Sequence, residues 1–399
     1  MDRYVVFVKA DGLCPWCHKA VALLEEKGYE YDTIDIDTGA ELIRRFKDLG
    51  HFLEKKPTFP QIIHRDTLIG GYDKLCQKID EPMLEDNPLR FTLFPLQYPG
   101  LFDMYKKAIA SFWTPDEVSL LEDVTDWSTK LSEDDRYFIK HILAFFAGSD
   151  GIVMENLAAN FAKEIQIPEA RQFYACQMMI EAVHSEQYAL LIDALADPKE
   201  ALGLFRAIET MPPVRKKAAW AQKYLDPSKK FAERLLAFIC VEGILFSGSF
   251  CAIYWLKRRG VMPGLTLSNE FISRDEALHY EFGVAMYKLL KHKLSESTVK
   301  KIITEAVENE LEFVVDAIPC RLIGMNSEMM QQYIKFVADR MFTDLGYSKV
   351  YQVENPFPWM ELIGLQGKTN FFEQFPSQYQ RAGVMAHTDD QVFGVDDEF

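Results

Sequence analysis

Residues 173–193 read FYACQMMIEAVHSEQYALLID, and this stretch decides the fold of most of the chain. Apolar residues recur through it at helical spacing, which predicts one long helix over Pro168–Leu195. Glu181 and His184 are three residues apart, so both side chains lie on one face of that helix. A carboxylate and an imidazole placed in this way can bind one metal ion together.

The same pair occurs again as Glu276 and His279, in an apolar helix predicted over Ser268–His292. Two further acids lie in apolar helical stretches, Asp150 in AFFAGSDGIVM and Glu242 in AFICVEGILF. A buried carboxylate is costly unless it is paired or binds a metal. One acid from each of two helices and Glu-x-x-His from each of two others is nearly the di-metal carboxylate pattern of ferritin-like bundles.

The types of ligand in this set limit the metal. Oxygen and imidazole ligands with no thiolate suit iron or manganese, and the sequence leaves the choice between the two open. Each acid taken alone could equally lie at a helix surface or in a salt bridge. Four such acids together favour the metal site.

The pattern after residue 90 is almost entirely helical, with several helices too apolar to lie at a surface. We therefore predict an all-α ferritin-like helical bundle over residues 91–365. Residues 366–399 lose the periodicity and form a flexible acidic tail in this prediction. The other predicted helices are Pro115–Trp127, Asp134–Ile165, Lys199–Met211, Val214–Tyr224, Lys230–Arg259, Ser297–Cys320 and Ser327–Leu345.

One stretch of the bundle also passes a crude test for a membrane span. Leu235–Leu256 is 22 residues long and Glu242 is its only charged residue. The mean hydropathy of the whole chain is −0.12, and no other stretch of this kind stands out. We therefore interpret it as a buried helix of a protein that does not enter the membrane.

The first 80 residues follow a different pattern, in which strands and helices alternate. The order is βαβαββα, which predicts a small α/β domain over residues 1–80, followed by an acidic, proline-bearing linker at 81–90. The predicted strands are Tyr4–Val8, Tyr31–Ile36, Gln61–Ile63 and Leu68–Ile69, and the predicted helices are Pro15–Lys27, Ala40–Leu49 and Asp73–Ile79.

A dithiol, Cys14-Pro-Trp-Cys17, follows the first strand and opens the first helix. The free N–H groups at a helix N-terminus stabilise a thiolate, which makes it a nucleophile for disulfide exchange. We expect Cys14 to attack and Cys17 to resolve the mixed disulfide. Half of a zinc site is the alternative, but no second Cys or His pair lies nearby at ligand spacing.

Together with this dithiol, the stretches TFPQI and GGYD make residues 1–80 resemble glutaredoxin, which has a thioredoxin-like fold. The resemblance implies a cis-proline at Pro60 beside the dithiol and a groove for glutathione. Four residues separate Lys9 from Cys14, where glutaredoxins usually have two. The residues that would line the groove by this resemblance are Lys9, Thr58, Phe59, Pro60, Gly71, Tyr72 and Asp73.

The helical part resembles the small, radical-generating subunit of class I ribonucleotide reductase, most closely the eukaryotic type. The resemblance covers about residues 87–399 and rests on the opening stretch together with DGIVMENL, VEGILFSGSF, RRGVMPGLTLSNEFISRDEALH, RLIGMN and NPFPWM. It implies two iron ions per chain, with manganese as the alternative. The implied metal ligands are Asp150, Glu181, His184, Glu242, Glu276 and His279.

The same resemblance assigns a tyrosyl radical to Tyr188, one helical turn after His184. By spacing alone, such a tyrosine is more often a core residue. Phe246 and Phe250 match the apolar residues that shield the radical in the family.

The resemblance further implies a homodimer and a separate large subunit that binds the nucleotide. Trp113, Asp275 and Tyr379 match the path that carries the radical to that subunit. Phe393 and Phe399, in the acidic tail, match the segment that docks on it. Whether the substrate is a di- or triphosphate stays open, because its pocket lies on the partner.

Composition limits the binding partners and the cellular compartment that we expect for the protein. Lys and Arg number 44 against 60 Asp and Glu, a net charge of −16, which argues against nucleic-acid or anionic-membrane binding. The seven cysteines are odd in number and sparse, and the N-terminus has no signal-peptide pattern, so we expect a cytoplasmic protein.

These features together predict a glutaredoxin fused to a ribonucleotide reductase small subunit, with the dithiol supplying reducing equivalents drawn from glutathione. Two alternatives share parts of the pattern. One is another ferritin-like di-iron oxidase or desaturase with a fused thiol–disulfide domain, which would need neither Tyr188 nor Trp113. The other is a redox carrier whose helical part only stores iron or binds partners.

Overall fold

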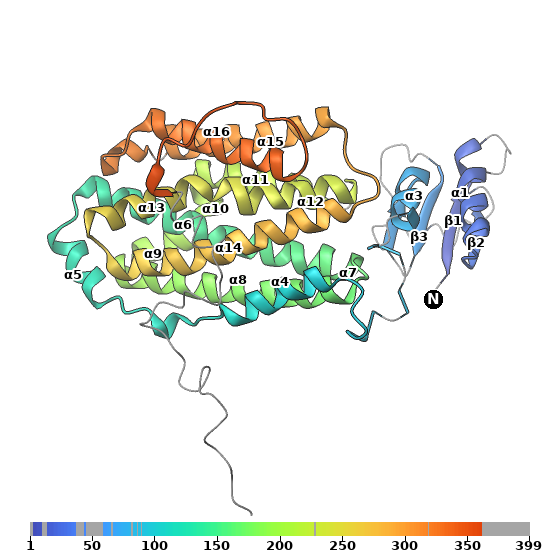
Figure 1. Ribbon diagram of the computed structural model, residues 1–399, viewed down its shortest axis with the longest axis horizontal. Helices are drawn as coiled ribbons and strands as arrows, with labels where there is room; N and C mark the ends of the chain where they lie inside the picture. The colour runs from blue at the N-terminus through green and yellow to red at the C-terminus, as the bar shows by residue number, and fades with distance from the viewer. Residues whose placement is uncertain are drawn as a thin grey trace, which may run out of the picture. The chain divides into compact units, whose positions relative to one another are not determined.

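The computed structural model describes residues 3–9, 14–36, 44, 59–64, 67–80, 83–85, 87–88, 90–226, 229–317 and 319–360 (Figure 1). Contacts divide the chain into two units, Met1–Glu354 and Asn355–Phe399. The second unit is described only over residues 355–360, where the Asn355 side chain accepts a 2.9 Å hydrogen bond from the Phe357 N–H.

The N-terminal elements form a four-stranded sheet in the order β2-β1-β3-β4, parallel between β1 and β2 and antiparallel elsewhere. This confirms the predicted α/β domain and its strands to within two residues. The predicted helix over Ala40–Leu49 lies outside the described residues apart from Arg44. The elements are β1 Tyr4–Val8, α1 Pro15–Glu26, β2 Tyr31–Asp35, β3 Gln61–His64, β4 Thr67–Gly70 and α3 Tyr72–Asp80.

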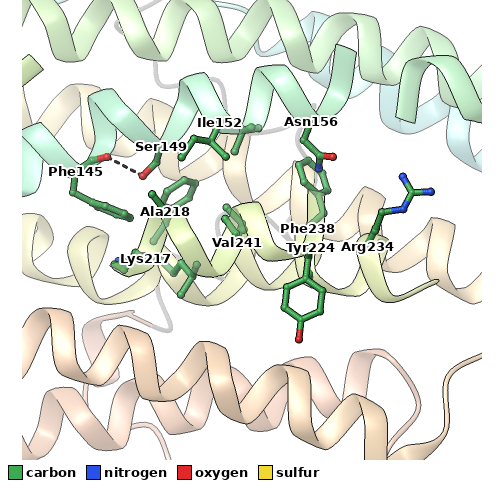
Figure 2. A pocket seen from close by; sticks show the side chains of 15 residues that line it. Phe145, Ser149, Ile152, Asn156, Lys217, Ala218, Tyr224, Arg234, Phe238 and Val241 are labelled. Carbon is green, nitrogen blue, oxygen red and sulfur yellow. Dashed lines mark hydrogen bonds between the residues drawn. The ribbon is translucent and has the colours of Figure 1, made fainter. Parts of the chain in front are cut away.

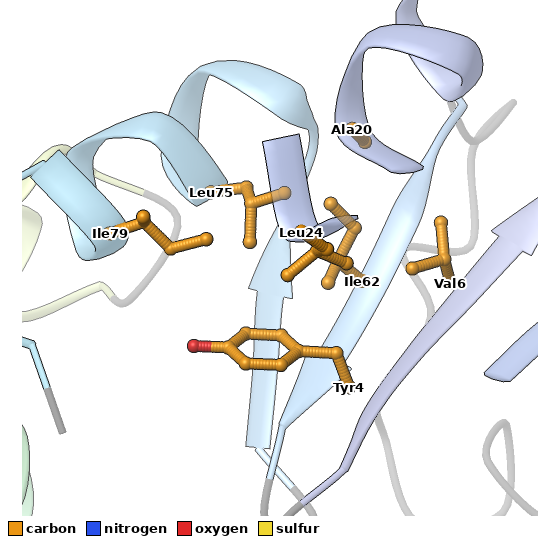
Figure 3. Close-up of a cluster of buried hydrophobic side chains, with 7 residues drawn as sticks. All are labelled: Tyr4, Val6, Ala20, Leu24, Ile62, Leu75 and Ile79. Carbon is orange, nitrogen blue, oxygen red and sulfur yellow. The ribbon is translucent and has the colours of Figure 1, made fainter. Parts of the chain in front are cut away.

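Apolar side chains from the sheet and from both helices α1 and α3 build one core (Figure 3). Helix α1 begins with Pro15, whose fixed φ suits the first helical turn, and the chain leaves it through Gly28 at a φ of +71°. This core therefore fixes where α1 starts, and with it the position of the dithiol. Its residues are Tyr4, Val6, Ala20, Leu24, Ile62, Leu75 and Ile79.

The predicted linker contains two buried apolar residues, Met83 and Leu84. The Met83 carbonyl accepts a 2.7 Å hydrogen bond from the N–H of Gln166, two residues before the bundle helix that begins at Pro168. The acidic composition of residues 81–90 predicted a linker and gave no sign of this hydrogen bond to the bundle.

The rest of unit 1 is the predicted helical bundle, whose long helices run in a common direction in Figure 1. Helix α8 spans Pro168–Leu195, the bounds predicted from its periodicity, and α14 begins earlier than predicted, at Pro263. Besides α8, the α-helices of the described bundle are α4 Pro99–Ala110, α5 Leu121–Thr129, α6 Glu133–Asn156, α7 Ala162–Glu164, α9 Pro198–Phe205, α10 Ala207–Thr210, α11 Pro212–Leu225, α12 Phe231–Cys240, α13 Ser247–Arg259, α14 Pro263–Leu289, α15 Glu296–Leu311 and α16 Ser327–Asp344.

Several of the helix predictions were wrong in detail. Helix α4 was missed. The helix predicted over Pro115–Trp127 is a 3₁₀ turn, η1 Pro115–Glu117, separated from α5 by Val118 in an extended conformation. The helix predicted over Lys199–Met211 breaks at Arg206, whose ψ of 22° ends α9.

The α-helix predicted over Ser297–Cys320 also ends early, at Leu311, and Pro319, which has no N–H, cannot extend the helical turns that follow it. Beyond α15 the chain forms a π-helix, η4 Glu312–Ala317, and a 3₁₀ turn, η5 Cys320–Ile323.

Two further π-helical segments interrupt the long apolar helices. They are η2 Leu157–Phe161, between α6 and α7, and η3 Val241–Leu245, between α12 and α13. Such segments are rare and are frequent at functional sites. Glu242 lies within η3.

Two continuous helical stretches of the described chain are long and apolar enough to cross a membrane, Glu133–Glu164 and Phe231–Arg259. The apolar window of the second is 94% buried inside the protein, so it is a core helix, as the sequence predicts. The window of the first is only 50% buried, so half of it is not covered by the described part of one chain.

A candidate metal centre and a candidate dithiol site

Six acids and imidazoles from four neighbouring elements meet inside the bundle, and each is at most 4% exposed. Their ligand atoms form two sets, in each of which all atoms lie within 4.8 Å of one another. One set is Glu181, Glu242, Glu276 and His279, and the other is Asp150, Glu181 and His184. Glu181 belongs to both, so the two positions are adjacent.

Glu181 and Glu276 lie between the two imidazole rings. His184 Nδ1 is 3.1 Å from Glu276 Oε1 and 3.4 Å from Glu181 Oε2. His279 Nδ1 is 3.1 Å from Glu181 Oε1 and 3.3 Å from Glu276 Oε2. The i,i+3 spacing on α8 and on α14 therefore brings both Glu-x-x-His pairs to the same place.

The cluster holds four carboxylates against two imidazoles, and the pKa values of its members reflect this. Burial, reinforced by the neighbouring acids, raises the pKa of Asp150 and of Glu242 well above the ordinary range. Burial would lower the pKa of His279, but Glu181 and Glu276 outweigh it and raise that pKa to about 9. The cluster therefore favours the entry of positive charge.

The residues fit a metal pair. Several buried ligand atoms of the cluster make no hydrogen bond within the described chain, although such atoms are normally paired. Carboxylate oxygens and imidazole nitrogens are ligands that iron and manganese accept. These atoms are Asp150 Oδ2, Glu181 Oε2, His184 Nδ1, Glu242 Oε2 and His279 Nε2.

Gln177, which the sequence analysis missed, joins two members of the cluster. Its Nε2 donates hydrogen bonds to Glu242 Oε1 at 3.0 Å and Glu181 Oε1 at 3.3 Å. The second oxygen of each carboxylate is left without a hydrogen bond. An amide four residues before Glu181, on the same face of an apolar helix, was the available signal.

Trp113, Asp275 and His184 form one buried hydrogen-bonded chain. The Trp113 indole N–H donates to Asp275 Oδ2 at 2.8 Å, and His184 Nε2 lies 3.2 Å from the same oxygen. The Arg274 guanidinium donates a hydrogen bond to the other oxygen, Asp275 Oδ1. Burial would raise the pKa of Asp275, but Arg274 and His184 favour the carboxylate and lower that pKa. Trp113 itself lies in the connection between α4 and η1.

Tyr188 is buried one turn after His184, among aromatic rings. Its ring stacks on Phe146 with centroids 4.7 Å apart, and Phe146 in turn contacts Phe246 at 5.8 Å and Phe250 at 5.1 Å. Burial and the charge of Asp150 raise the pKa of Tyr188 well above its ordinary value. Phe146 was missed in the sequence, although it lies four residues before Asp150 on the same helix face.

A cavity of about 30 Å³ borders this aromatic group, between α6, α11, α12 and η3 (Figure 2). Phe145 and Phe246 are part of its wall, and Lys217 and Val241 border it as well. The described residues that line it include none of the six acids and imidazoles. The carboxylate cluster is thus enclosed by protein on this side.

The N-terminal domain presents the dithiol at the start of α1. Cys14 and Cys17 are joined by a disulfide, with Cα atoms 5.3 Å apart. Cys14 is half-buried and Cys17 is buried, and the Cys17 N–H donates to Cys14 Sγ at 3.2 Å. Cys14 Sγ lies 3.7 Å from the carbonyl oxygen of Phe59, which precedes a cis peptide bond to Pro60.

Most residues expected in the glutathione groove lie around this dithiol. The Lys9 ammonium is 5.6 Å from the centre of the Phe59 ring, and the Tyr72 ring is 5.7 Å from that of Trp16. Gly71 packs against Pro60, since a Cβ at that position would lie 3.7 Å from the Pro60 carbonyl oxygen. Asp73 is exposed in the first turn of α3, and Thr58 lies outside the described residues. The residues predicted for the radical path and the docking tail, Tyr379, Phe393 and Phe399, also lie outside them.

Fold and site together define a ferritin-like bundle with a buried carboxylate–histidine cluster that could hold metal, preceded by a dithiol domain of thioredoxin-like fold. Two family models match the protein, "Ribonucleotide reductase, small chain" over residues 90–356 and "Glutaredoxin" over residues 4–69. The protein belongs to the ribonucleotide reductase small-chain family and carries a glutaredoxin domain in front.

Known relatives agree with this assignment. The protein is 59% identical over 308 residues to the small chain of ribonucleoside-diphosphate reductase from Nicotiana tabacum, covering 77% of this sequence and 93% of that one. It is 57% identical over 322 residues to subunit M2 of the same reductase from Danio rerio, covering 80% and 83%.

Among solved structures, the Rnr4 homodimer of Saccharomyces cerevisiae matches with a TM-score of 0.65 at 34% identity, covering 72% of this sequence and 93% of that one. The R2 subunit from Clostridium botulinum matches with a TM-score of 0.63, covering 67% and 88%, and at 23% identity it supports the fold alone.

Proposed function

We propose that this protein generates and stores a tyrosyl radical at Tyr188, which a separate large subunit uses to reduce ribonucleoside diphosphates to deoxyribonucleotides. The observation that carries the proposal is the buried six-residue cluster, joined through His184 to the Trp113–Asp275 chain of hydrogen bonds. The names of the known relatives favour a diphosphate substrate.

The cluster is proposed to hold two iron ions, with manganese as the alternative, through Asp150, Glu181, His184, Glu242, Glu276 and His279. When bound, the metal pair would supply the oxygen-dependent oxidising power that a buried phenol needs. Tyr188 gives up one electron and its phenolic proton. Phe146, Phe246 and Phe250 keep water and reductants away from the resulting radical.

The oxidising equivalent is proposed to leave the centre through Asp275 and Trp113, the buried residues hydrogen-bonded beyond His184. Tyr379 would continue the path to the large subunit, and Phe393 and Phe399 would dock on it. These three residues lie outside the described part of the sequence and are proposed from the resemblance alone.

The N-terminal domain is proposed to reduce the disulfide that each turnover leaves on the large subunit. The Cys14 thiolate attacks that disulfide, forms a mixed disulfide and releases one thiol. Cys17 then displaces the second thiol, which leaves the Cys14–Cys17 disulfide seen here. Two glutathione molecules reduce it again and become glutathione disulfide, and the groove around Phe59, Pro60 and Tyr72 would bind them.

We also propose that residues 1–80 and 91–365 act as two modules joined by the linker. Tethering raises the effective concentration of the reductant near its target. Separating the modules and assaying them at low micromolar concentration tests this. Turnover equal to that of the intact protein would contradict a role for the tether.

A homodimer is proposed through the neighbouring helices α6 and α8. The apolar stretch that contains α6 is only half buried, and α8 exposes Met179 at 42% and Leu190 at 43%. A second copy of the protein would cover this face. The structural relative from S. cerevisiae is itself a homodimer.

Electron paramagnetic resonance after addition of Fe(II) and oxygen to the metal-free protein tests the central proposal. The wild type is expected to show a tyrosyl signal that Tyr188→Phe lacks. A wild type without that signal, or a signal that survives in Tyr188→Phe, would contradict the radical role. The two alternative functions, oxidase and iron store, require neither the signal nor the Trp113–Asp275 contact.

A further inference from the structure

A buried ion pair, one member of which borders the cavity described above, has no part in the function proposed above. Lys217, on α11, is 2% exposed, and its Nζ is 2.6 Å from Glu310 Oε2 on α15. Burying two charges costs more than their attraction returns unless further hydrogen bonds satisfy the remaining atoms. The partners of these atoms therefore indicate what the pair does.

Those partners are backbone groups on either side of Phe246 and Ser247, where η3 meets α13. Lys217 Nζ donates to the carbonyl of Leu245, the last residue of the π-helix, at 2.5 Å. Glu310 Oε1 accepts from the N–H of Gly248, in the first turn of α13, at 2.9 Å. Carbonyls at the end of one helical segment and N–H groups at the start of the next need partners from outside.

The residues around the ion pair accommodate both of its charged groups. Lys217 Nζ lies 3.5 Å from the centre of the Phe145 ring and 4.0 Å from that of Phe313, so two aromatic faces surround the cation (Figure 2 labels Phe145 and Lys217). At Gly248 a Cβ would come 2.6 Å from Glu310 Oε1. Glycine at this position allows the carboxylate to reach the backbone.

We propose that Lys217 and Glu310 are positioning residues that hold the π-helical register of η3. They thereby place Glu242 in the proposed metal cluster and Phe246 against Phe146, the ring that stacks on Tyr188. A π-helical turn carries one extra residue. Loss of that turn would rotate the helix on one side of it by about 100° relative to the other. Glu242 or Phe246 would then leave its place. Among the described residues, no hydrogen bond or ion pair joins this pair to the proposed metal ligands or to Tyr188. The inference rests on the proposed ligand role of Glu242.

The test compares Lys217→Met and Glu310→Gln with Lys216→Met. Lys216 is the neighbouring residue on α11 and pairs with Glu312 at the surface, so it is a matched control. Mn(II) is titrated into each metal-free, full-length protein and bound metal is counted. The wild type and Lys216→Met should bind two Mn(II) per chain, and the two test variants should bind the weaker one about 10- to 100-fold less tightly.

Hydrogen exchange separates positioning from plain stabilisation. In the test variants, the amides of residues 241–250 should exchange faster while those of residues 175–185 on α8 keep their protection. A lower melting temperature with unchanged Mn(II) affinity and unchanged exchange at 241–250 would overturn the inference.

Gly248→Ala provides a second route if Lys217→Met does not fold. It displaces the Glu310 carboxylate without changing any charge, and the same loss of Mn(II) affinity is expected. Unchanged affinity in folded Gly248→Ala and Glu310→Gln would also overturn the inference. A wild type that binds no Mn(II) pair would count against the proposed function instead.

Discussion

At the scale of single residues, Gln177 determines which carboxylate oxygens can face a metal. Its amide engages Oε1 of Glu181 and of Glu242, and it leaves Oε2 of both without a hydrogen bond. Groups that orient metal ligands in this way tune affinity although they never touch the ion.

Gln177→Met should therefore lower the affinity for Mn(II) or Fe(II) about 10- to 100-fold, because both carboxylates lose the donor that orients them. Titration of the metal-free protein, followed by electron paramagnetic resonance of free Mn(II), measures this. Gln172→Met, an exposed change on the same helix, is the control and should bind as the wild type does. Equal affinity in all three proteins would rule out the orienting role.

Trp113→Phe should separate radical formation from radical use. The variant keeps Tyr188 and all six proposed metal ligands but loses the N–H that donates to Asp275. We expect a normal tyrosyl signal and at least a 100-fold loss of nucleotide reduction in the presence of the large subunit, on the order of 3 kcal/mol at the transition state. Trp127→Phe, outside this chain of hydrogen bonds, should retain activity. Full activity of Trp113→Phe would exclude the path.

At the scale of elements, Asp135 stabilises the N-terminus of α6 and links it to α13. It accepts from the Ser132 N–H at 3.0 Å and pairs with Arg259, at the end of α13. Burial disfavours the ionised form, but Arg259 and the Ser132 hydrogen bonds prevail and lower the pKa of Asp135 to about 2.

Asp135→Asn should destabilise the protein at pH 7 by about 1–3 kcal/mol, since a charged acceptor is lost. A carboxylate whose pKa falls on folding stabilises the native state above its unfolded value, near 3.8, and stops doing so as the pH falls through about 2. The difference in melting temperature between variant and wild type should be constant from pH 7 to 5 and shrink below pH 4. Asp134→Asn, exposed on the first turn of the same helix, serves as the reference. A difference that grows on acidification would contradict this assignment.

The sequence predicted the long helices better than their interruptions. Apolar periodicity placed α8 to the residue, because burial of one face decides such a helix. The π-helical segment η3 was not visible, since its apolar residues read as one uninterrupted helix over Lys230–Arg259. Helix α4 was missed because it follows a stretch that contains Pro88 and Pro95 and itself begins with Pro99.

The candidate site shows the same division. The six acids and imidazoles stood out because ionisable residues are unusual within apolar helices. Gln177, Phe146 and the Lys217–Glu310 pair did not, since an amide, an aromatic ring or a surface-type charge is ordinary at helical spacing. Their roles depend on contacts between helices that one helix's pattern does not contain.

At the scale of the whole molecule, the half-covered apolar face of α6 and α8 bears on assembly. Met179→Asp together with Leu190→Asp should convert a dimer to a monomer, because both charges would be buried against the second copy. Light scattering after size-exclusion chromatography gives the mass directly. Leu202→Asp, at a more exposed site on α9, should leave the dimer intact. A wild type that is monomeric at micromolar concentration would refute the proposed interface.

Asp275 Oδ2, the oxygen that Trp113 and His184 both contact, should couple the fluorescence of Trp113 to the metal cluster. Indole emission responds to the bonding and charge around its ring, and here the indole is one atom removed from an imidazole of the cluster. Positive charge arriving at His184 polarises that oxygen and changes the environment of the excited indole. The difference in fluorescence between this protein and Trp113→Phe should therefore follow metal loading in real time, as a gauge built into the protein.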